Sequence, residues 1–236
     1  MDPWFANLSV QKHLSSTEVL SLQHDGFIVM QGSVPPHRLV EASDAYDHAV
    51  SAATLDDVKV GSTTIRVSDF VNRGAAFDKF YTSPPVLEAA CRIIQQPFKL
   101  STMHARTVQP GVPGQRLHVD FASDCQGWPM LGFIYMIDQF TENNGATRFI
   151  PGSQGIETLP ESFSSVPACG PAGSVIVFNG SVWHGHGPNE TDQTRRSIQG
   201  AYIRRNEDCS ATLSVRMLPR TLDRIDALAK YLLNVN

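Results

Sequence analysis

The sequence contains little cysteine, and its cysteines are widely spaced. Four occur in 236 residues, and no two form a CxxC pair; they are Cys91, Cys125, Cys169 and Cys209. This spacing excludes a zinc ribbon and a redox dithiol. It also argues against a disulfide framework, so we expect a reduced protein located in the cytoplasm.

Excess positive charge and long apolar runs are absent as well. Lys and Arg number 19 against 23 Asp and Glu, which gives a net charge of −4 and a pI of about 6.0. That balance offers no basic surface for nucleic acid. No apolar segment is long enough to span a membrane, and the first residues lack the apolar core of a secretory signal. We therefore expect neither nucleic acid nor membrane as a partner.

Helix signals occur in the N-terminal third. Ser15 and Glu18 have the spacing of a capping box, which predicts a helix that ends near residue 26. The apolar run at 27–30 predicts a short strand. Pro-rich starts predict two further helices, one over 35–53 and one over 83–95.

After Pro97 the pattern changes to short β-type runs separated by turn residues. Many short strands with regular turns predict a sandwich or barrel. We expect a single domain over 1–236 that is mainly β with flanking helices: a helical third at 1–97, a β core at 98–218 and a C-terminal helix at 221–233. The expected core strands are Lys99–Val108, Leu117–Phe121, Leu131–Ile137, Thr147–Ile150, Ser174–Phe178, Ser197–Ile203 and Thr212–Met217.

A candidate metal site lies in this β-rich part. His118 and Asp120 are two residues apart, so on a strand they point to the same face. His184 comes shortly after a later strand, and two imidazoles with one carboxylate make the facial triad that leaves positions open for a co-substrate and O2. Arg195 follows 11 residues later, and its guanidinium fork could hold the remote carboxylate of a keto acid.

Each of these assignments has an alternative. A His-x-Asp pair alone is a weak signal, and the plain reading is a strand histidine beside an exposed aspartate. His186 competes with His184 as the distal ligand, because both end the same segment and spacing alone does not choose. The strand-like Val182 and Trp183 favour His184, which leaves His186 to line the pocket or lie in an exposed loop.

Three segments together resemble the phytanoyl-CoA dioxygenase (PhyH) family of Fe(II)/2-oxoglutarate oxygenases, in particular its natural-product branch. They are PGVPGQRLHVDF at 110–121, ENNGATRFIPGSQ at 142–154 and WHGHGPNETDQTRRSIQGAY at 183–202. Segments 14–32 and 64–89 are similar as well, so the resemblance covers most of the chain. It implies a double-stranded β-helix, a cupin-like jelly roll, with flanking helices.

The resemblance also implies the cofactors and the metal ligands. It places Fe(II) on His118, Asp120 and His184, with 2-oxoglutarate and O2 as co-substrates. Because Asp120 is present, the chain does not resemble the iron halogenases, which lack this carboxylate to make room for halide.

For 2-oxoglutarate, the resemblance implies Arg195 rather than Arg196 as the anchor of the remote carboxylate. For Arg66, which it also suggests as a contact, the plain alternative is a surface arginine. The full set of co-substrate contacts that it suggests is Arg195, Gln115, Thr147, Ser197 and Arg66.

Strand 99–108 should form part of the substrate pocket, although the sequence does not say which of its faces lines the barrel. Arg106 could bind an anionic substrate or form a surface salt bridge. The two candidate faces are Thr102, His104 and Arg106 on one side and Met103, Ala105 and Thr107 on the other.

The expected activity is hydroxylation, desaturation or cyclisation at an unactivated C–H bond of a small natural product or amino-acid-like metabolite, with release of succinate and CO2. An acyl-CoA is less expected, because the sequence has no basic cluster suited to its phosphates. A homodimer is implied by the resemblance. Two alternatives stay open on the same fold: an isomerase that needs no 2-oxoglutarate, and a metal- or ligand-binding barrel without catalysis.

Overall fold

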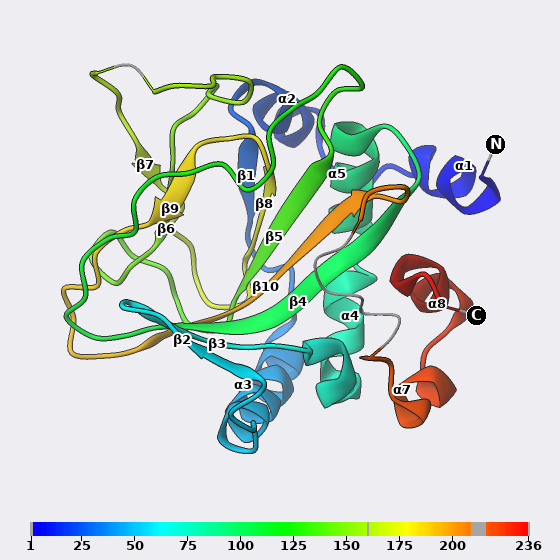
Figure 1. Ribbon diagram of the computed structural model, residues 1–236, viewed down its shortest axis with the longest axis horizontal. Helices are drawn as coiled ribbons and strands as arrows, with labels where there is room; N and C mark the ends of the chain where they lie inside the picture. The colour runs from blue at the N-terminus through cyan, green and yellow to red at the C-terminus, as the bar shows by residue number, and fades with distance from the viewer. Residues whose placement is uncertain (1, 160, 209–215, 236) are drawn as a thin grey trace.

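The computed structural model describes residues 2–159, 161–208 and 216–235, and Figure 1 shows their arrangement. A large antiparallel sheet has the strand order β1-β8-β5-β10-β4-β3-β2, and a small sheet has the order β7-β6-β9. The strands are β1 (Phe27–Met30), β2 (Val58–Val60), β3 (Thr64–Val67), β4 (Phe98–Val108), β5 (Met130–Met136), β6 (Thr147–Phe149), β7 (Val166–Pro167), β8 (Val175–Asn179), β9 (His184–His186) and β10 (Arg195–Arg204). The helices are α1 (Pro3–Ser9), α2 (Ser16–His24), α3 (Pro36–Ser51), α4 (Asp78–Tyr81), α5 (Pro84–Ile94), α7 (Pro219–Arg224) and α8 (Ala227–Leu233), with two 3-10 turns at Phe70–Arg73 and Ala75–Phe77.

The two sheets pack face to face through an apolar cluster that includes Ile134, Phe149, Ile176 and Phe178. A second and larger core lies between the other face of the large sheet and the helices, where α5 contacts β5, β8 and β10. This is the jelly roll with flanking helices that the sequence predicted. None of the helices in the described ranges is long and apolar enough to cross a membrane.

The main strands begin and end within two residues of their predicted bounds, because strong β patterns and turn residues mark them. On β4 the face that carries Met103 and Ala105 is buried in the helix-side core. The opposite face, with Thr102, His104 and Arg106, lines a cavity. The structure thereby decides which face of this strand is available to ligands.

The helix predictions are confirmed at three places. Ser15 caps α2 in a complete capping box with Glu18, α3 begins at Pro36, and Ser83 precedes α5. The C-terminal helix predicted at 221–233 is wrong as one element: Ile225 is extended, and the Asp226 side chain accepts from the Ala229 N–H to begin α8. A new N-cap inside the segment therefore divides it into two short helices.

Two further predictions need correction. The strand predicted at 27–30 is confirmed as β1, which pairs with β8 at one edge of the large sheet. The rest of the N-terminal third is not only helical, since β2 and β3 complete the other edge of this sheet. The strand predicted at Leu117–Phe121 is wrong, because only His118 forms an isolated β-bridge there, to His184. The strand predicted at Thr212–Met217 falls mostly outside the described residues.

Candidate metal and co-substrate site

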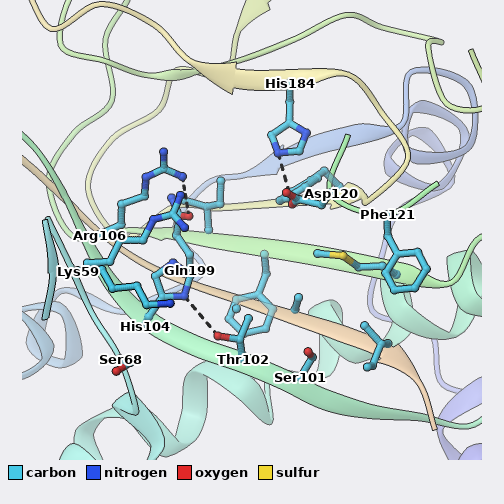
Figure 2. A pocket seen from close by; sticks show the side chains of 18 of the residues that line it. Lys59, Ser68, Ser101, Thr102, His104, Arg106, Asp120, Phe121, His184 and Gln199 are labelled. Carbon is cyan, nitrogen blue, oxygen red and sulfur yellow. Dashed lines mark hydrogen bonds and ion pairs between the residues drawn. The ribbon is translucent and has the colours of Figure 1, made fainter. Parts of the chain in front are cut away.

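Three potential metal ligands meet where the small sheet faces the large one. One ligand atom from each of His118, Asp120 and His184 lies within 4.8 Å of the others. The Asp120 carboxylate lies 3.5 Å from His118 Nε2 and 3.4 Å from His184 Nε2. Figure 2 shows His184 and Asp120 pointing toward each other at the edge of the cavity.

Backbone pairing, rather than strand alternation, brings these side chains together. His118 and His184 exchange two N–H···O=C hydrogen bonds of 2.9 Å each. The Asp120 N–H donates to the Gly180 carbonyl at 2.9 Å, which fixes the next turn of the same irregular segment. The segment at 115–121 is thus held to 180–186 along its length, and the three ligand atoms converge without a regular strand.

Both histidines are oriented by a hydrogen bond from the other ring nitrogen. His118 Nδ1 lies 3.0 Å from the Arg116 carbonyl, and His184 Nδ1 lies 2.9 Å from the Val182 carbonyl. A carbonyl only accepts, so each Nδ1 carries the proton and each Nε2 is left as a ligand. Hydrogen bonds of this kind, at the ring nitrogen that does not bind the metal, fix the tautomer and the orientation of a metal-binding imidazole.

Aromatic packing holds His184 from behind. Its ring stacks on Phe149 at 5.6 Å between centroids and lies 4.7 Å from the ring of Phe178. Phe178 fits only because residue 132 is glycine: a Cβ at Gly132 would lie 2.2 Å from the Phe178 ring. A glycine on β5 therefore supports a ligand on β9.

The ionised state of Asp120 suits a divalent metal. Burial alone would raise the pKa of Asp120, but the adjacent His118 and His184 side chains outweigh it and hold that pKa below its ordinary value. An ionised carboxylate with two Nε2 atoms on one side of a gap is the donor set of a two-histidine, one-carboxylate iron site, so these residues fit the metal.

His186 lies apart from this cluster. Its Nδ1 donates to the Gly187 carbonyl at 2.8 Å, and its Nε2 lies 2.9 Å from the Thr63 hydroxyl. Burial, foremost, lowers its pKa to about 4, so it is a neutral and fully hydrogen-bonded residue of the cavity wall. The choice of His184 over His186 agrees with this geometry.

The cluster opens on a cavity of about 770 Å³. One side of it is cationic and polar, with Lys59, His104 and Arg106 together in Figure 2, and Phe121 stands on the opposite side. The other polar lining residues include Arg66, Gln115, Thr147, Gln199, Asp56, Asp57 and Asp208, and the apolar ones include Met130, Phe133, Ile134, Phe178 and Ile203.

Three of the five predicted co-substrate residues line this cavity, namely Gln115, Thr147 and Arg66. Arg195 and Ser197 do not. They lie on the same face of β10 as the cavity residue Gln199, and Ser197 is completely buried. The surface-arginine alternative for Arg66 is not what the structure shows.

Arg195 is a buried cation with no carboxylate partner in the described part of the chain. It is 1% exposed, donates to the Gly145 carbonyl at 2.8 Å and to Ser197 Oγ at 3.2 Å, and lies over the Phe140 ring at 4.0 Å. Its Nε has no hydrogen-bond partner among the described residues. Burial and the neighbouring Arg106 lower its pKa to about 9. A carboxylate would compensate this desolvated charge, so the residue fits the remote end of 2-oxoglutarate.

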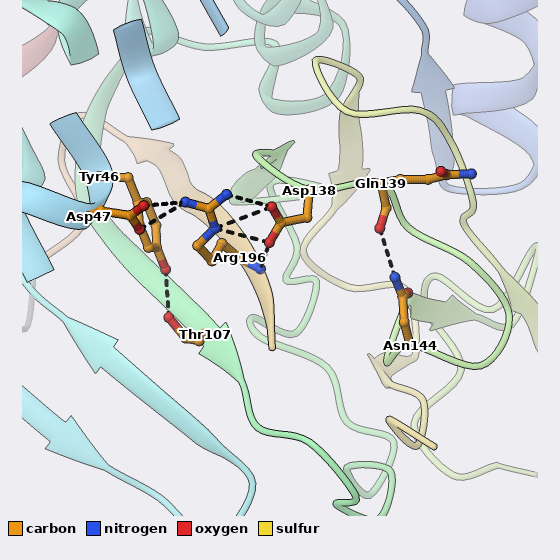
Figure 3. A network of polar contacts seen from close by, with 7 residues as sticks. All are labelled: Tyr46, Asp47, Thr107, Asp138, Gln139, Asn144 and Arg196. Carbon is orange, nitrogen blue, oxygen red and sulfur yellow. Dashed lines mark hydrogen bonds and ion pairs between the residues drawn. The ribbon is translucent and has the colours of Figure 1, made fainter. Parts of the chain in front are cut away.

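Arg196 points the other way and is fully paired. Figure 3 shows its guanidinium between Asp138 and Asp47. The shortest nitrogen–oxygen distances are 2.7 Å to Asp138 and 2.8 Å to Asp47. These bonds attach α3 to the first residues of β10, the central strand of the large sheet, near the Tyr46–Thr107 hydrogen bond. Arg196 is thus already neutralised, which agrees with the choice of Arg195 as the free cation.

Among the polar residues of the cavity, sequence reasoning missed Gln199 and Lys59 and left the role of Arg106 open. A signal for Gln199 was present, because Arg195, Ser197 and Gln199 alternate on one strand and must share a face. For Arg106, the alternation of side chains along β4 did not show which face of the strand lines the cavity. The packing of Met103 and Ala105 against the helices decides it.

A jelly roll with two histidines and a carboxylate at the mouth of a ligand cavity defines the class of non-haem iron oxygenases. The profile of the family described as phytanoyl-CoA dioxygenase (PhyH) matches residues 22–197. The chain belongs to this family.

Curated relatives are fungal dioxygenases. Dioxygenase trt7 of Aspergillus terreus is 29% identical over 197 residues, which cover 75% of this chain and 69% of the relative. The multifunctional dioxygenase prhA of Penicillium brasilianum is 28% identical over 222 residues, covering 81% of this chain and 73% of the relative.

Solved structures share the fold at lower identity. The epimerase SnoN, in complex with Fe3+, α-ketoglutarate and nogalamycin RO, has a TM-score of 0.70 at 18% identity and covers 91% of each chain. The carbocyclase SnoK has a TM-score of 0.69 at 14% identity, covering 81% of this chain and 85% of its own. Together with the family, these comparisons identify a non-haem iron dioxygenase that uses Fe(II), 2-oxoglutarate and O2.

Proposed function

We propose that the protein oxidises an unactivated C–H bond of a small natural product or amino-acid-like metabolite. One oxygen atom of O2 enters succinate as 2-oxoglutarate loses CO2, and the other enters the product or leaves as water when the outcome is desaturation or cyclisation. The observation that carries the proposal is the His118, Asp120 and His184 cluster at a cavity of about 770 Å³. That volume suits a small or medium ligand beside the co-substrate.

Each predicted site residue has a proposed task. His118, Asp120 and His184 would hold Fe(II), which when bound supplies the activation of O2. Arg195, assisted by Ser197, would hold the remote carboxylate of 2-oxoglutarate. Gln115, Thr147 and Arg66 would complete its contacts from the cavity wall. The apolar side around Phe121 would exclude water and orient the substrate carbon.

The names of the relatives support this choice of chemistry without fixing its outcome. The curated relatives carry the name dioxygenase, two of the structural neighbours are an epimerase and a carbocyclase, and one fold thus supports several outcomes. The homodimer and the cytoplasmic location expected from the sequence stay predictions.

The proposal is tested by following 2-oxoglutarate consumption, succinate and O2 uptake with candidate metabolites. We expect succinate and oxidised product in equal amounts, with slow succinate release when no substrate is present. Product without succinate would favour the isomerase alternative. Tight metal binding with neither O2 uptake nor product for any compound would favour the binding barrel.

A further inference from the structure

Arg106 on β4 is a second cation on the inner face of the large sheet, next to Arg195. In the antiparallel register Arg106 lies opposite Ser197, and Arg195 lies opposite Val108. Arg106 and Arg195 are therefore on adjacent cross-strand pairs of one face. Ser197 links them, because its hydroxyl accepts from Arg195 and donates to the Arg106 carbonyl, each at 3.2 Å.

The Arg106 guanidinium is held by neutral groups alone. It donates to Gln115 Oε1 at 2.7 Å and to Gln199 Oε1 at 3.4 Å, and its buried Nε has no partner in the part of the chain that the structure describes. Within the described ranges no carboxylate lies at ion-pair distance from it. Burial first, and then the Arg66 charge, lower its pKa to about 10. The surface salt bridge considered for this residue is not formed.

Like charges face Arg106 from the neighbouring strand as well. Arg66 on β3 lies directly opposite it, and Lys59 on β2 lies opposite Arg66. Like charges in directly opposed positions destabilise a sheet. A row of three cations on a cavity wall is therefore expected where an anion completes the site.

We propose that Arg106 is a second anchor for the remote carboxylate of 2-oxoglutarate, acting beside Arg195. Because arginine only donates, the Gln115 oxygen that it contacts must be the acceptor, and the Gln115 NH2 is left free to donate to the same carboxylate. Arg106 thus both contacts the anion and sets the orientation of the Gln115 amide. The inference rests on the proposed function, since it assumes that 2-oxoglutarate occupies this cavity.

The test compares two ligands by anaerobic calorimetry on the Fe(II)-loaded protein. 2-Oxovalerate has the keto-acid end of 2-oxoglutarate and a methyl group in place of the remote carboxylate. For Arg106→Gln we expect the Kd of 2-oxoglutarate to rise about 30-fold or more, the effect of truncating one partner of a buried charge pair. The Kd of 2-oxovalerate should stay almost unchanged.

Two further variants make the result specific. Arg196→Gln removes an arginine that is paired with Asp138 and Asp47 outside the cavity, and it should change either Kd only slightly, which shows that loss of a nearby positive charge does not by itself weaken binding. Arg195→Gln should remove the preference for 2-oxoglutarate. If Arg106→Gln does not fold, Arg106→Lys should bind 2-oxoglutarate with intermediate affinity and 2-oxovalerate like the unchanged protein.

Different outcomes overturn different claims. If Arg106→Gln weakens both ligands equally, or neither, Arg106 does not act on the remote carboxylate and the inference is wrong. If in that case Arg195→Gln still abolishes the preference for 2-oxoglutarate over 2-oxovalerate, the proposed function stands. If the unchanged protein does not prefer 2-oxoglutarate at all, the proposed function itself fails.

Discussion

Asp120→Ala is expected to abolish 2-oxoglutarate turnover. Asp120 is the one carboxylate of the cluster, and both histidines place their Nε2 atoms 3.4 to 3.5 Å from it. Mutation of a residue that only hydrogen-bonds a metal ligand lowers metal affinity or activity about 10- to 100-fold. Removal of the ligand itself should therefore lower turnover by more than about 100-fold. The measurement is the rate of succinate formation at saturating Fe(II), together with the Kd for the metal.

Asp47→Ala is the matched control for this variant. It also removes one carboxylate, but from the exposed side of the Arg196 pair, away from the cavity. We expect normal turnover and a slightly lower free energy of unfolding. The metal assignment would have to be abandoned if Asp120→Ala kept turnover within tenfold of the unchanged protein while remaining folded.

Arg195→Gln is expected to raise the KM for 2-oxoglutarate about 30-fold or more. Arg195 is 1% exposed, its Nε has no partner, and it has no carboxylate of its own among the described residues. A carboxylate bound beside Arg195 would form a buried charge pair with it. Removal of one partner of such a pair weakens binding by about 2 to 5 kcal/mol, and about 1.4 kcal/mol corresponds to a tenfold change in affinity. Steady-state kinetics with varied 2-oxoglutarate measures the effect.

Arg196→Gln offers a control one residue away. Arg196 is paired with Asp138 and Asp47 on the outer side of the sheet. Its loss should lower the free energy of unfolding by about 1 kcal/mol and leave the KM for 2-oxoglutarate unchanged. The opposite pattern, a high KM for Arg196→Gln and a normal one for Arg195→Gln, would exchange the two assignments.

Much of the fold could be predicted, because alternation and turn residues mark the long strands. β4 is an example, since buried and less buried side chains alternate over parts of its length and the Pro110-Gly111 turn follows it. The two-part C-terminal helix could not be predicted with confidence from pattern, since the cap at Asp226 depends on the extended Ile225 before it. Strands β2 and β3 have only three and four residues, too few for a clear alternation, and β3 is held in the sheet by its pairing with β4.

The residues of the site were predicted from sequence motifs, but the reason given for their position in space was wrong. His118 and Asp120 were assigned to a strand, yet they are placed by hydrogen bonds to His184 and Gly180, which are more than 50 residues away in the sequence. Such long-range pairing leaves no local pattern. The same holds for Arg106, whose partners Gln115 and Gln199 come from two other segments.

The central claim is that this cluster holds Fe(II) with 2-oxoglutarate bound beside it, and one spectrum tests it most directly. Fe(II) is added to the protein without oxygen, followed by 2-oxoglutarate, and the visible absorption is recorded. We predict a weak charge-transfer band that requires both additions and is absent in Asp120→Ala. A protein that binds Fe(II) but shows no band with saturating 2-oxoglutarate would contradict the account.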